Sequence, residues 1–395
     1  MGLLLLSLVQ LGSATLVCKS LQPAIVTDTW CDMNCNAPVP YCPPADCKCT
    51  GGGGGSDDDV KPPGSDDDDS SAPVEPDVCA AHANANANAT ASGGGGSKFE
   101  LVGYVCPSCP SAPDPAALLA DVHEAYTVVN IAFIAWSTDG HVLDQINDPK
   151  KPHFNFTREH VAALKKQVRG RHVMVSLGGG LSGVLDCGAP KSFGTNLARG
   201  LHAIVDKYGF DGVDFDIEHR SGDFAKCAAL LAPVLKSLHA SKLRVSLAPQ
   251  MGNVNPETSK TSAGQNELAP LVGTALQCMT AVMPQMYNTW AAVESVAYAE
   301  KYARLATAGW RVAEDGKRYV VKIPPAKLYL GFPCSARGAS SGYIAPKDLV
   351  AMLKSLRSSG LELGGIMCWS IGWDRMASYA FAKAMQGLAT DWARE

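Results

Sequence analysis

The sequence has no apolar run long enough to cross a membrane, and this absence removes one large class of function. A spanning helix needs about 20 consecutive apolar residues, and the only candidate stretch covers residues 3–11. This short stretch, followed by Gly12 and Ala14, is typical of the apolar region and cleavage site of a secretory signal peptide. No Lys or Arg precedes it, so a buried N-terminal helix or strand is the alternative. We predict a signal peptide over residues 1–14.

Positive charge is scarce and forms no stripe anywhere in the chain. Lys and Arg number 34 against 38 Asp and Glu, which gives a net charge of −4. Residues 1–97 carry a net charge of −9, so the remaining residues 98–395 are mildly basic, at +5. Because no basic stripe is interleaved with aromatic residues, the sequence does not indicate binding to nucleic acid.

Cysteine is concentrated near the N-terminus, where six of the 14 residues occupy positions 18, 31, 35, 42, 47 and 49. So short a segment buries too little apolar surface to form a core of its own. It also contains no His, a common zinc ligand. We therefore predict a disulfide-rich module over residues 18–50, with a metal site as the alternative. Disulfides imply a secreted, extracellular protein or one in a vacuolar or lysosomal lumen.

Residues 51–97 have very few large apolar side chains. They consist of Gly and Ser runs, two Asp runs and an Ala-Asn repeat. A segment with so little to bury is expected to be a disordered linker, extended by repulsion between its Asp residues. Calcium binding is the alternative, but the Asp runs lack the turn-forming framework of a calcium loop.

From residue 98 onward, short apolar segments alternate with helical patterns. Two helices are predicted at residues 196–208, between Thr195 as cap and Gly209 as stop, and at residues 223–241. Strands are predicted at residues 99–105, 128–134, 172–177, 212–217, 243–248, 281–286, 328–332 and 365–369. This alternation predicts a (β/α)8 TIM barrel over residues 98–395. A doubly wound sheet is the alternative, but residues 104–107 are not the glycine-rich nucleotide loop typical of that fold.

Three carboxylates alternate with apolar residues in the fourth predicted strand. Because side chains on a strand alternate between faces, Asp214, Asp216 and Glu218 share one face. The opposite face, with residues 213, 215 and 217, is apolar and suits the surrounding helices. The acidic face should therefore point into the barrel, where unpaired charges are costly. Glu218, the last of the three, is expected at the C-terminal mouth, where such barrels have their active sites. An edge strand with a wet acidic face is the alternative.

The pattern Asp-x-x-Asp-x-Asp-x-Glu over residues 211–218 resembles the signature of glycoside hydrolase family 18, the chitinases. With His219, the string is most similar to plant class III chitinases of the hevamine type. Segments 176–180, 285–288 and 367–370 resemble the family motifs of the third, sixth and eighth strands. The resemblance covers about residues 98–390. The cysteine-rich module over residues 18–50 resembles small modules appended to chitin- and cellulose-active proteins, which implies carbohydrate binding; a protease-resistant module without a ligand is the alternative.

This resemblance implies retaining hydrolysis in which the substrate's own 2-acetamido group attacks, forming an oxazolinium intermediate. It implies that Glu218 protonates the glycosidic oxygen and then deprotonates water. Asp216 would orient the acetamido N–H, Asp214 would share a proton with Asp216, and Tyr287 would donate to the acetamido carbonyl. No cofactor and no metal are implied.

The resemblance also implies a set of substrate-binding residues. Trp369 would form the floor under the −1 sugar, and Tyr104 and Phe133 would line the pocket. Gly178 and Gly179 are expected to let the backbone approach the substrate, and a tight turn at these glycines is the alternative. The sixth-strand motif adds two residues, Gln285 and Asn288. We hypothesise that outer sugar-binding subsites are lined by Trp136, Trp290 and Trp373.

About 35 residues separate the last two predicted strands, too few for an inserted domain. We therefore expect a shallow groove, which favours internal cutting of chitin or N-acetylglucosamine oligosaccharides. We also expect the protein to be a monomer. Three alternatives remain open: a chitin lectin without activity, an endoglycosidase acting on N-glycan cores, and cleavage of peptidoglycan. The first is disfavoured because Glu218 is present.

Overall fold

The computed structural model describes residues 17–20, 47–50, 79, 99–147, 155–180, 182–289 and 295–392. The predicted signal peptide and most of the predicted module and linker fall outside these residues, as does Trp290. The chain divides into two units, Met1–Asp69 and Ser70–Glu395. In the first unit, β1 (Val17–Ser20) pairs antiparallel with β2 (Cys47–Thr50), with Cys18 opposite Cys49.

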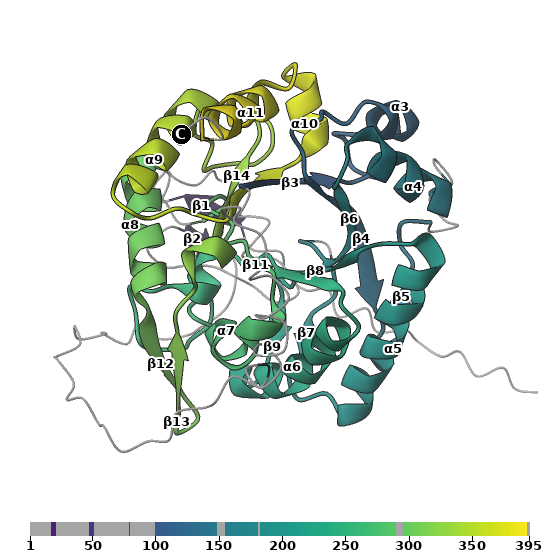
Figure 1. The fold of residues 1–395 in the computed structure, drawn as a ribbon. Helices are drawn as coiled ribbons and strands as arrows, with labels where there is room; N and C mark the ends of the chain where they lie inside the picture. Colours follow the sequence, from purple (N-terminus) through teal and green to yellow (C-terminus); the bar gives the residue numbers. More distant parts are fainter. Residues whose placement is uncertain are drawn as a thin grey trace, which may run out of the picture. The chain divides into compact units, whose positions relative to one another are not determined.

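The second unit is a parallel barrel, as predicted (Figure 1). Its strands are β3 (Glu100–Val105), β4 (Val128–Trp136), β6 (His172–Gly178), β8 (Gly212–Asp216), β10 (Arg244–Leu247), β11 (Ala281–Val282), β14 (Tyr329–Pro333) and β15 (Gly365–Trp369). They are hydrogen-bonded in the order β11-β10-β8-β6-β4-β3-β15-β14. Two isolated parallel bridges, 282 to 328 and 285 to 331, connect the ends of this order into a ring.

All eight predicted strands are present, but β11 is shorter than predicted. It covers two residues, whereas the sequence pattern predicts six. Pro284 has no N–H to donate to a ladder, and beyond Val282 the chain makes only isolated bridges, such as that of Gln285 with Gln250.

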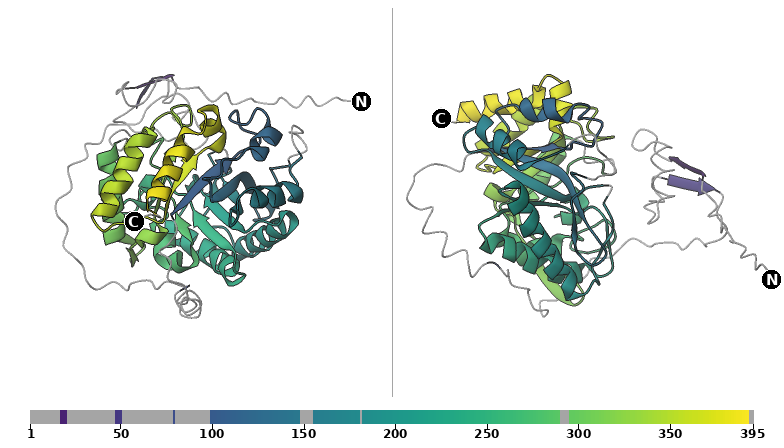
Figure 2. Two further views of the ribbon diagram at one scale, coloured as in Figure 1. Left: turned by 45° about the horizontal axis from the view of Figure 1, so that its top comes forward. Right: turned by 90° about the vertical axis from the view of Figure 1, so that its right-hand side faces the viewer.

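Helices surround the ring and alternate with its strands (Figures 1 and 2). They are α3 (Pro115–Ala120), α4 (Arg158–Gln167), α5 (Lys191–Tyr208), α6 (Phe224–Ala240), α7 (Ala269–Ala275), α8 (Val296–Ala308), α9 (Pro346–Ser358), α10 (Ile371–Met376) and α11 (Ala380–Trp392). A doubly wound open sheet is therefore excluded. Within the described residues, no helix has the length and apolar character needed to cross a membrane.

The two predicted helices are confirmed, with one boundary corrected. Asp223 caps α6 by accepting a hydrogen bond from Ala225 N at 2.9 Å. Helix α5 ends at Gly209, in the left-handed conformation at φ +76°, as expected for a glycine stop. It begins at Lys191, earlier than predicted. Thr195 therefore lies inside the helix, where its hydroxyl donates to the Lys191 carbonyl, and it is not the cap.

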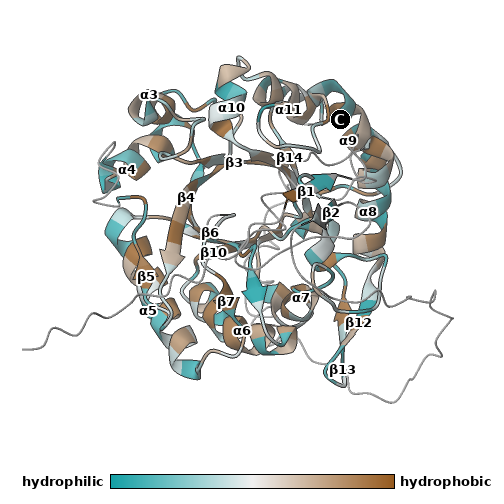
Figure 3. Cartoon of the chain, turned by 180° about the vertical axis from the view of Figure 1, so that it is seen from behind, coloured by the Kyte–Doolittle hydropathy of each residue, from teal (hydrophilic) through white to brown (hydrophobic). Residues whose placement is uncertain are grey.

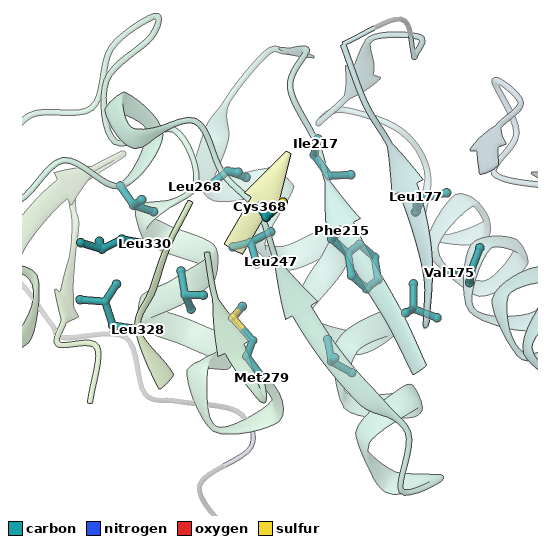
Figure 4. Packing of buried hydrophobic residues seen from close by; sticks show 14 of the residues in the cluster. Val175, Leu177, Phe215, Ile217, Leu247, Leu268, Met279, Leu328, Leu330 and Cys368 are labelled. Carbon is teal, nitrogen blue, oxygen red and sulfur yellow. The ribbon is translucent and has the colours of Figure 1, made fainter. Parts of the chain in front are cut away.

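The core has two layers, one on each side of the strands. The outer layer fills the space between strands and helices and includes Val213, Phe215 and Ile217 of the β8 segment. Figure 4 shows part of it, with Phe215 and Ile217 beside Val175 and Leu177 of β6. The hydrophobic colouring of β4 in Figure 3 fits a strand buried on both faces. The inner layer fills the barrel itself with residues such as Val128, Met174 and Met367, a packed interior typical of this fold.

Connections differ in the structure they carry. Between β14 and β15 the only helix is α9, so the predicted absence of an inserted domain is confirmed. An additional antiparallel hairpin, β12 (Trp310–Glu314) with β13 (Lys317–Val321), follows α8 and precedes β14. It is not foreseen from the sequence. Short pairs add β5 (Val142–Leu143) to β4, and β7 (Leu185–Asp186) to β9 (Arg220–Ser221).

Four disulfides link the cysteines described in the second unit: Cys79–Cys278, Cys106–Cys109, Cys187–Cys227 and Cys334–Cys368. The first is unexpected, because Cys79 falls within the range predicted to be a linker. Its side chain is buried, and the bond ties the chain to the segment just before β11. The composition of residues 51–97 conceals this attachment point.

Candidate functional site

The predicted carboxylate face of β8 points into the barrel. Asp214 and Asp216 are 0 % and 4 % exposed, and their strand ends at Asp216. Glu218 follows two residues later and is half-buried. The ladder therefore rises from the packed interior to the C-terminal mouth, where parallel barrels have their active sites. The alternative of an edge strand with a wet face is excluded.

Asp214, the deepest carboxylate, is held by three hydroxyl groups. Its Oδ2 accepts hydrogen bonds from Tyr104 and Ser176, both at 2.7 Å, and its Oδ1 accepts one from Ser246 at 2.6 Å. Burial raises its pKa to about 6, while the three donors act in the opposite direction. Hydroxyl donors around a carboxylate favour its charged form, so Asp214 is the member of the ladder built to be ionised near neutral pH.

Asp216 lies between two other carboxylates. Burial raises its pKa well above the usual value, and the negative charges of Glu218 and Asp214 raise it further. One hydrogen bond opposes this, from Gln285 Nε2 to Asp216 Oδ1 at 2.8 Å. Neighbouring carboxylates this close do not all ionise together, and Asp216 is the one best placed to retain a proton.

Glu218 has an environment suited to an acid that works near neutral pH. Burial raises its pKa, and nearby groups limit the rise, His219 first. Gln250, which lies beyond the end of β10, points its Nε2 toward Glu218 Oε2 at 3.4 Å. A carboxyl group with a raised pKa can deliver a proton to a leaving group and recover it from water.

Aromatic rings form a wall beside the ladder. Trp369 is half-buried at the end of β15 and stacks on Phe133 at 5.7 Å between ring centroids. Tyr104 meets the same indole edge-on at 5.5 Å. Since the Tyr104 hydroxyl also donates to Asp214, this residue joins the aromatic wall to the carboxylates.

Tyr287 and Asn288 follow β11 and have different surroundings. Tyr287 is 5 % exposed. Burial raises its pKa well above the usual value, as do the charges of Asp216 and Glu218, so its hydroxyl remains a proton donor. Asn288 is exposed, and its Oδ1 accepts hydrogen bonds from the amide and hydroxyl of Ser340, at 3.0 and 2.8 Å. In this structure, Asn288 fastens the loop that follows β14.

Two predicted backbone contacts have structural explanations. Gly178 has a φ of +119°, and a Cβ there would lie 2.0 Å from the Asp216 carbonyl oxygen. Gly179 has a φ of +85°, and a Cβ there would meet the Phe133 ring at 2.8 Å. The missing side chain of Gly178 thus lets the end of β6 lie against the β8 backbone, and that of Gly179 leaves room for the Phe133 ring. Their contacts with sugar remain predictions.

Several contacts differ from the sequence-based expectations. Gln285 uses its Nε2 for Asp216 and for the Ala248 carbonyl, at 2.8 and 3.0 Å, so it positions Asp216. Trp136 is buried in the outer core layer, so the hypothesis that it lines an outer subsite is wrong. Trp373 is half-buried with the Arg337 guanidinium 5.0 Å from its ring centroid, and its role stays a hypothesis.

Sequence reasoning missed Ser246, Gln250 and Arg220, all of which lie close to the ladder. For Ser246 a signal exists, because a polar residue in an otherwise apolar buried strand needs a partner. Gln250 lies in the connection that follows β10, and Arg220 lies in the short strand β9 that follows β8. The period of the barrel strands does not predict side-chain directions in these connections. None of the described His, Cys, Asp and Glu residues form a group able to hold a metal ion.

A hollow of about 400 Å³ lies away from the ladder, between the loop after β3 and helix α10. Its charged groups are already partnered. Arg375 bonds Asp121 at 3.0 Å, and Lys383 donates to the Ser378 carbonyl at 2.8 Å. The Asp114 side chain caps α3. We assign no ligand to this hollow.

Comparisons with known proteins agree with this geometry. Residues 100–343 match the family model described as Glycosyl hydrolases family 18. A chitinase from Enterococcus faecalis is 28% identical over 276 residues, covering 65% of this chain and 74% of that protein. Chitinase D from Niallia circulans is 24% identical over 318 residues, and the match covers 70% of this chain but only 60% of that relative's length.

Solved structures show the same fold. A family GH18 chitinase from Chromobacterium violaceum superposes with a TM-score of 0.61 at 22% identity, over 74% of this chain and 84% of that one. Bacterial, fungal and plant proteins all match, so the predicted plant class III branch is not singled out. With more than half of its length matched by the family model, this chain belongs to glycoside hydrolase family 18.

Proposed function

We propose that this protein is a chitinase that cuts β-1,4-linked N-acetylglucosamine polymers internally, with retention of configuration. One observation carries the proposal. In a family 18 barrel, three carboxylates of one strand face end at Glu218, at the barrel mouth beside an aromatic wall. The names of the relatives, chitinases from bacteria, fungi and plants, point to the same substrate.

Glu218 acts first as acid and then as base. It protonates the glycosidic oxygen as the bond to the anomeric carbon breaks, and the resulting carboxylate later removes a proton from water. Along the strand, Asp216 lies roughly 6.6 Å below Glu218, at about 3.3 Å per residue. From there, Asp216 faces the acetamido group better than it faces the anomeric carbon. The acetamido oxygen therefore serves as the nucleophile, and an oxazolinium intermediate follows.

The remaining residues hold the acetamido group for attack. Asp216 accepts a hydrogen bond from the acetamido N–H. It also retains a proton, which it shares with the ionised Asp214 below it. Tyr287, whose hydroxyl remains protonated, donates to the acetamido carbonyl. The Trp369 ring packs against the apolar face of the −1 sugar, supported by Phe133.

The groove and the compartment complete the proposal. No domain is inserted between β14 and β15, so one wall of the groove is low, which favours internal cutting over processive cutting from an end. Asn288 at the sixth-strand motif favours the hevamine-like branch. Four disulfides in the described residues favour a secreted protein in an oxidising compartment. We propose that it acts as a monomer.

Product stereochemistry tests the mechanism. Two successive displacements retain configuration, so the first product seen by NMR should be the β anomer. Oligomers without the N-acetyl group at the −1 sugar should resist cleavage, because the nucleophile is missing. An initial α anomer, or equal cleavage of cellulose and chitin oligomers, would overturn this mechanism even though the fold is that of family 18.

Substrate choice needs a separate experiment. Chitin oligomers, a high-mannose glycopeptide and peptidoglycan should be offered to the same enzyme preparation, and chitin oligomers should be cut fastest. Faster release from the glycopeptide would indicate an endoglycosidase, and binding of all three without turnover would indicate a lectin.

A further inference from the structure

A buried arginine follows Glu218 closely in the chain. Arg220 lies in β9, and its side chain is only 2 % exposed. Its Nη1 donates to the carbonyl of Ile217, the residue that immediately precedes Glu218. Its Nε and Nη2 both donate to Glu267 Oε2, the Nε bond at 2.9 Å. A guanidinium that is bonded on both edges in this way has one fixed position.

Glu267 connects this arginine to a different part of the barrel. It precedes α7, in the connection that follows the fifth barrel strand, and its side chain is 10 % exposed. Its Oε1 accepts a hydrogen bond from Gly264 N at 2.7 Å. The Arg220–Glu267 pair therefore ties the segment carrying Glu218 to the neighbouring loop.

The segment after Glu218 is also held from the other side. Leu185 N donates to the His219 carbonyl at 2.9 Å, and β7 pairs with β9. His219 Nε2 lies 3.0 Å from the Gly180 carbonyl. The Cys187–Cys227 disulfide links the same two connections. Arg220 is thus a built element of the site, distinct from a mobile surface arginine.

We propose that the Arg220–Glu267 pair positions Glu218 and sets the pH at which Glu218 loses its catalytic proton. The guanidinium fixes the Ile217 carbonyl, and with it the direction in which Glu218 leaves the strand. Its positive charge, partly offset by Glu267, stabilises the carboxylate form of Glu218 beside two other acids. This inference rests on the proposed role of Glu218 as the acid.

The electrostatic surroundings single out Arg220. Arg220 contributes a positive charge beside the acids, and its guanidinium is fixed by the bonds to Ile217 and Glu267. Its charge lowers the pKa of Glu218 and of Asp216, against the stronger upward effect of burial. The other charged or titratable groups around Glu218 and Asp216 are Asp214 and Asp216 on the strand, His219 after it, Tyr104 on β3, Tyr287 after β11, and Glu267 behind Arg220.

Two single substitutions should move the pH profile in opposite directions. Arg220→Met removes the cation and leaves the anion of Glu267, so the pKa of Glu218 rises. Glu267→Gln leaves the cation unopposed, so the pKa of Glu218 falls. We expect the loss of one partly screened charge behind the acid to move the pKa of Glu218 by about 0.5–1 unit. The alkaline limb of kcat/KM against pH should shift upward by that amount in the first variant and downward in the second.

A third variant separates charge from position. Arg220→Lys keeps the charge but loses the planar fork that reaches the Ile217 carbonyl and Glu267 together. Its alkaline limb should stay within about 0.3 unit of wild type, while kcat falls about tenfold or more because Glu218 is misdirected. A purely structural role would lower stability in all three variants without these opposite shifts.

The matched control is a second arginine–glutamate pair at the other end of the barrel. Arg244 Nη2 bonds Glu100 Oε2 at 2.6 Å, and Arg244 lies beside Gly212 in the strand register. Gly212 is six residues, roughly 20 Å, from Glu218 along the strand. Arg244→Met and Glu100→Gln should therefore leave the alkaline limb in place.

The profiles are measured on soluble chitin oligomers with enzyme shown to be folded by its thermal unfolding. Shifts of the same sign in Arg220→Met and Glu267→Gln, or no shift in either, would overturn the inference. If Arg220→Met does not fold, the isosteric Glu267→Gln and the charge-conserving Arg220→Lys still decide it. Failure of the proposed function is seen separately, as full activity in Glu218→Gln.

Discussion

The two faces of β8 use the same backbone for opposite purposes. Outward, Val213, Phe215 and Ile217 are almost completely buried among aliphatic and aromatic neighbours. Inward, Asp214 and Asp216 are equally buried but depend on hydrogen bonds for their stability. Apolar burial stabilises the fold by about 25 cal/mol per Å², whereas a buried carboxylate must recover its lost hydration through hydrogen bonds or a proton. One face stabilises the barrel, and the other is retained at a cost to stability.

This contrast separates effects on activity from effects on folding. Substitutions on the inward face should change turnover and pH dependence more than stability. Substitutions on the outward face should change stability and leave the chemistry of the remaining folded molecules intact.

The largest effect on activity is expected at the top of the inward face. Glu218→Gln removes the transferable proton but keeps the size of the side chain, so hydrolysis of chitin oligomers should fall by about 10²–10⁴-fold or more. Oligosaccharide binding, measured by calorimetry, should persist. Activity within tenfold of wild type would show that Glu218 is not the acid.

The largest effect on stability is expected on the outward face. Phe215→Ala leaves a cavity in the outer layer, and the free energy of unfolding should fall by about 3–5 kcal/mol in a denaturant titration. The kcat of the folded fraction should stay close to wild type. A large loss of kcat without a loss of stability would mean that the two faces are not separable.

Sequence alone predicted this division because it depends on local rules. Period-two alternation placed Asp214, Asp216 and Glu218 on one face, and buried apolar runs located all eight strands. The short β11 was not predicted, because Pro284 interrupts a run that is otherwise apolar. The hairpin β12–β13 was missed because it lies between α8 and β14, where the expected alternation of strands and helices includes no further strands.

The partners of the ladder were harder to predict than the ladder itself. Ser246 and Gln250 lie about 30 residues beyond it in sequence, and Glu267 lies farther still. Their contacts depend on how neighbouring strands are aligned and on loop conformations, which a strand period does not specify. Cys79 was missed because residues 51–97 have few large apolar side chains, and a disulfide partner 199 residues away leaves no local signal.

The pH dependence of stability should distinguish the faces further. Folding raises the pKa of Asp214 from its usual 3.8 to about 6, so between these values the native state binds more protons than the unfolded chain. Stability contributed by this group is then present at low pH and lost as pH rises through about 6, by about 3 kcal/mol in total.

Asp214→Asn removes this titration. The free energy of unfolding, followed from pH 4 to 6.5, should decline less steeply in the variant, by about 1.4 kcal/mol per pH unit between the two pKa values. Val213→Ala, on the outward face next to it, is the control and should lower stability by the same amount at every pH. An unchanged slope in Asp214→Asn would mean that Asp214 is not the group whose protonation responds to folding.

The smallest effect is expected from a single donor beneath the ladder. Ser246 provides one of three hydroxyl groups that bond Asp214, and Ser246→Ala removes it without adding volume. Loss of a hydrogen bond to a charged acceptor costs about 1–3 kcal/mol. In this variant the pKa of Asp214 should rise, because the charged form loses a donor while burial is unchanged. Because Asp214 is then less readily ionised, less negative charge stabilises the proton on Asp216, and kcat should fall by about tenfold at neutral pH.

The loss of kcat caused by Ser246→Ala should shrink or disappear in an Asp214→Asn background, where no charge remains to be stabilised. A double-mutant cycle measures this coupling. Additive effects in that cycle would indicate that Ser246 acts on the site by a route independent of Asp214.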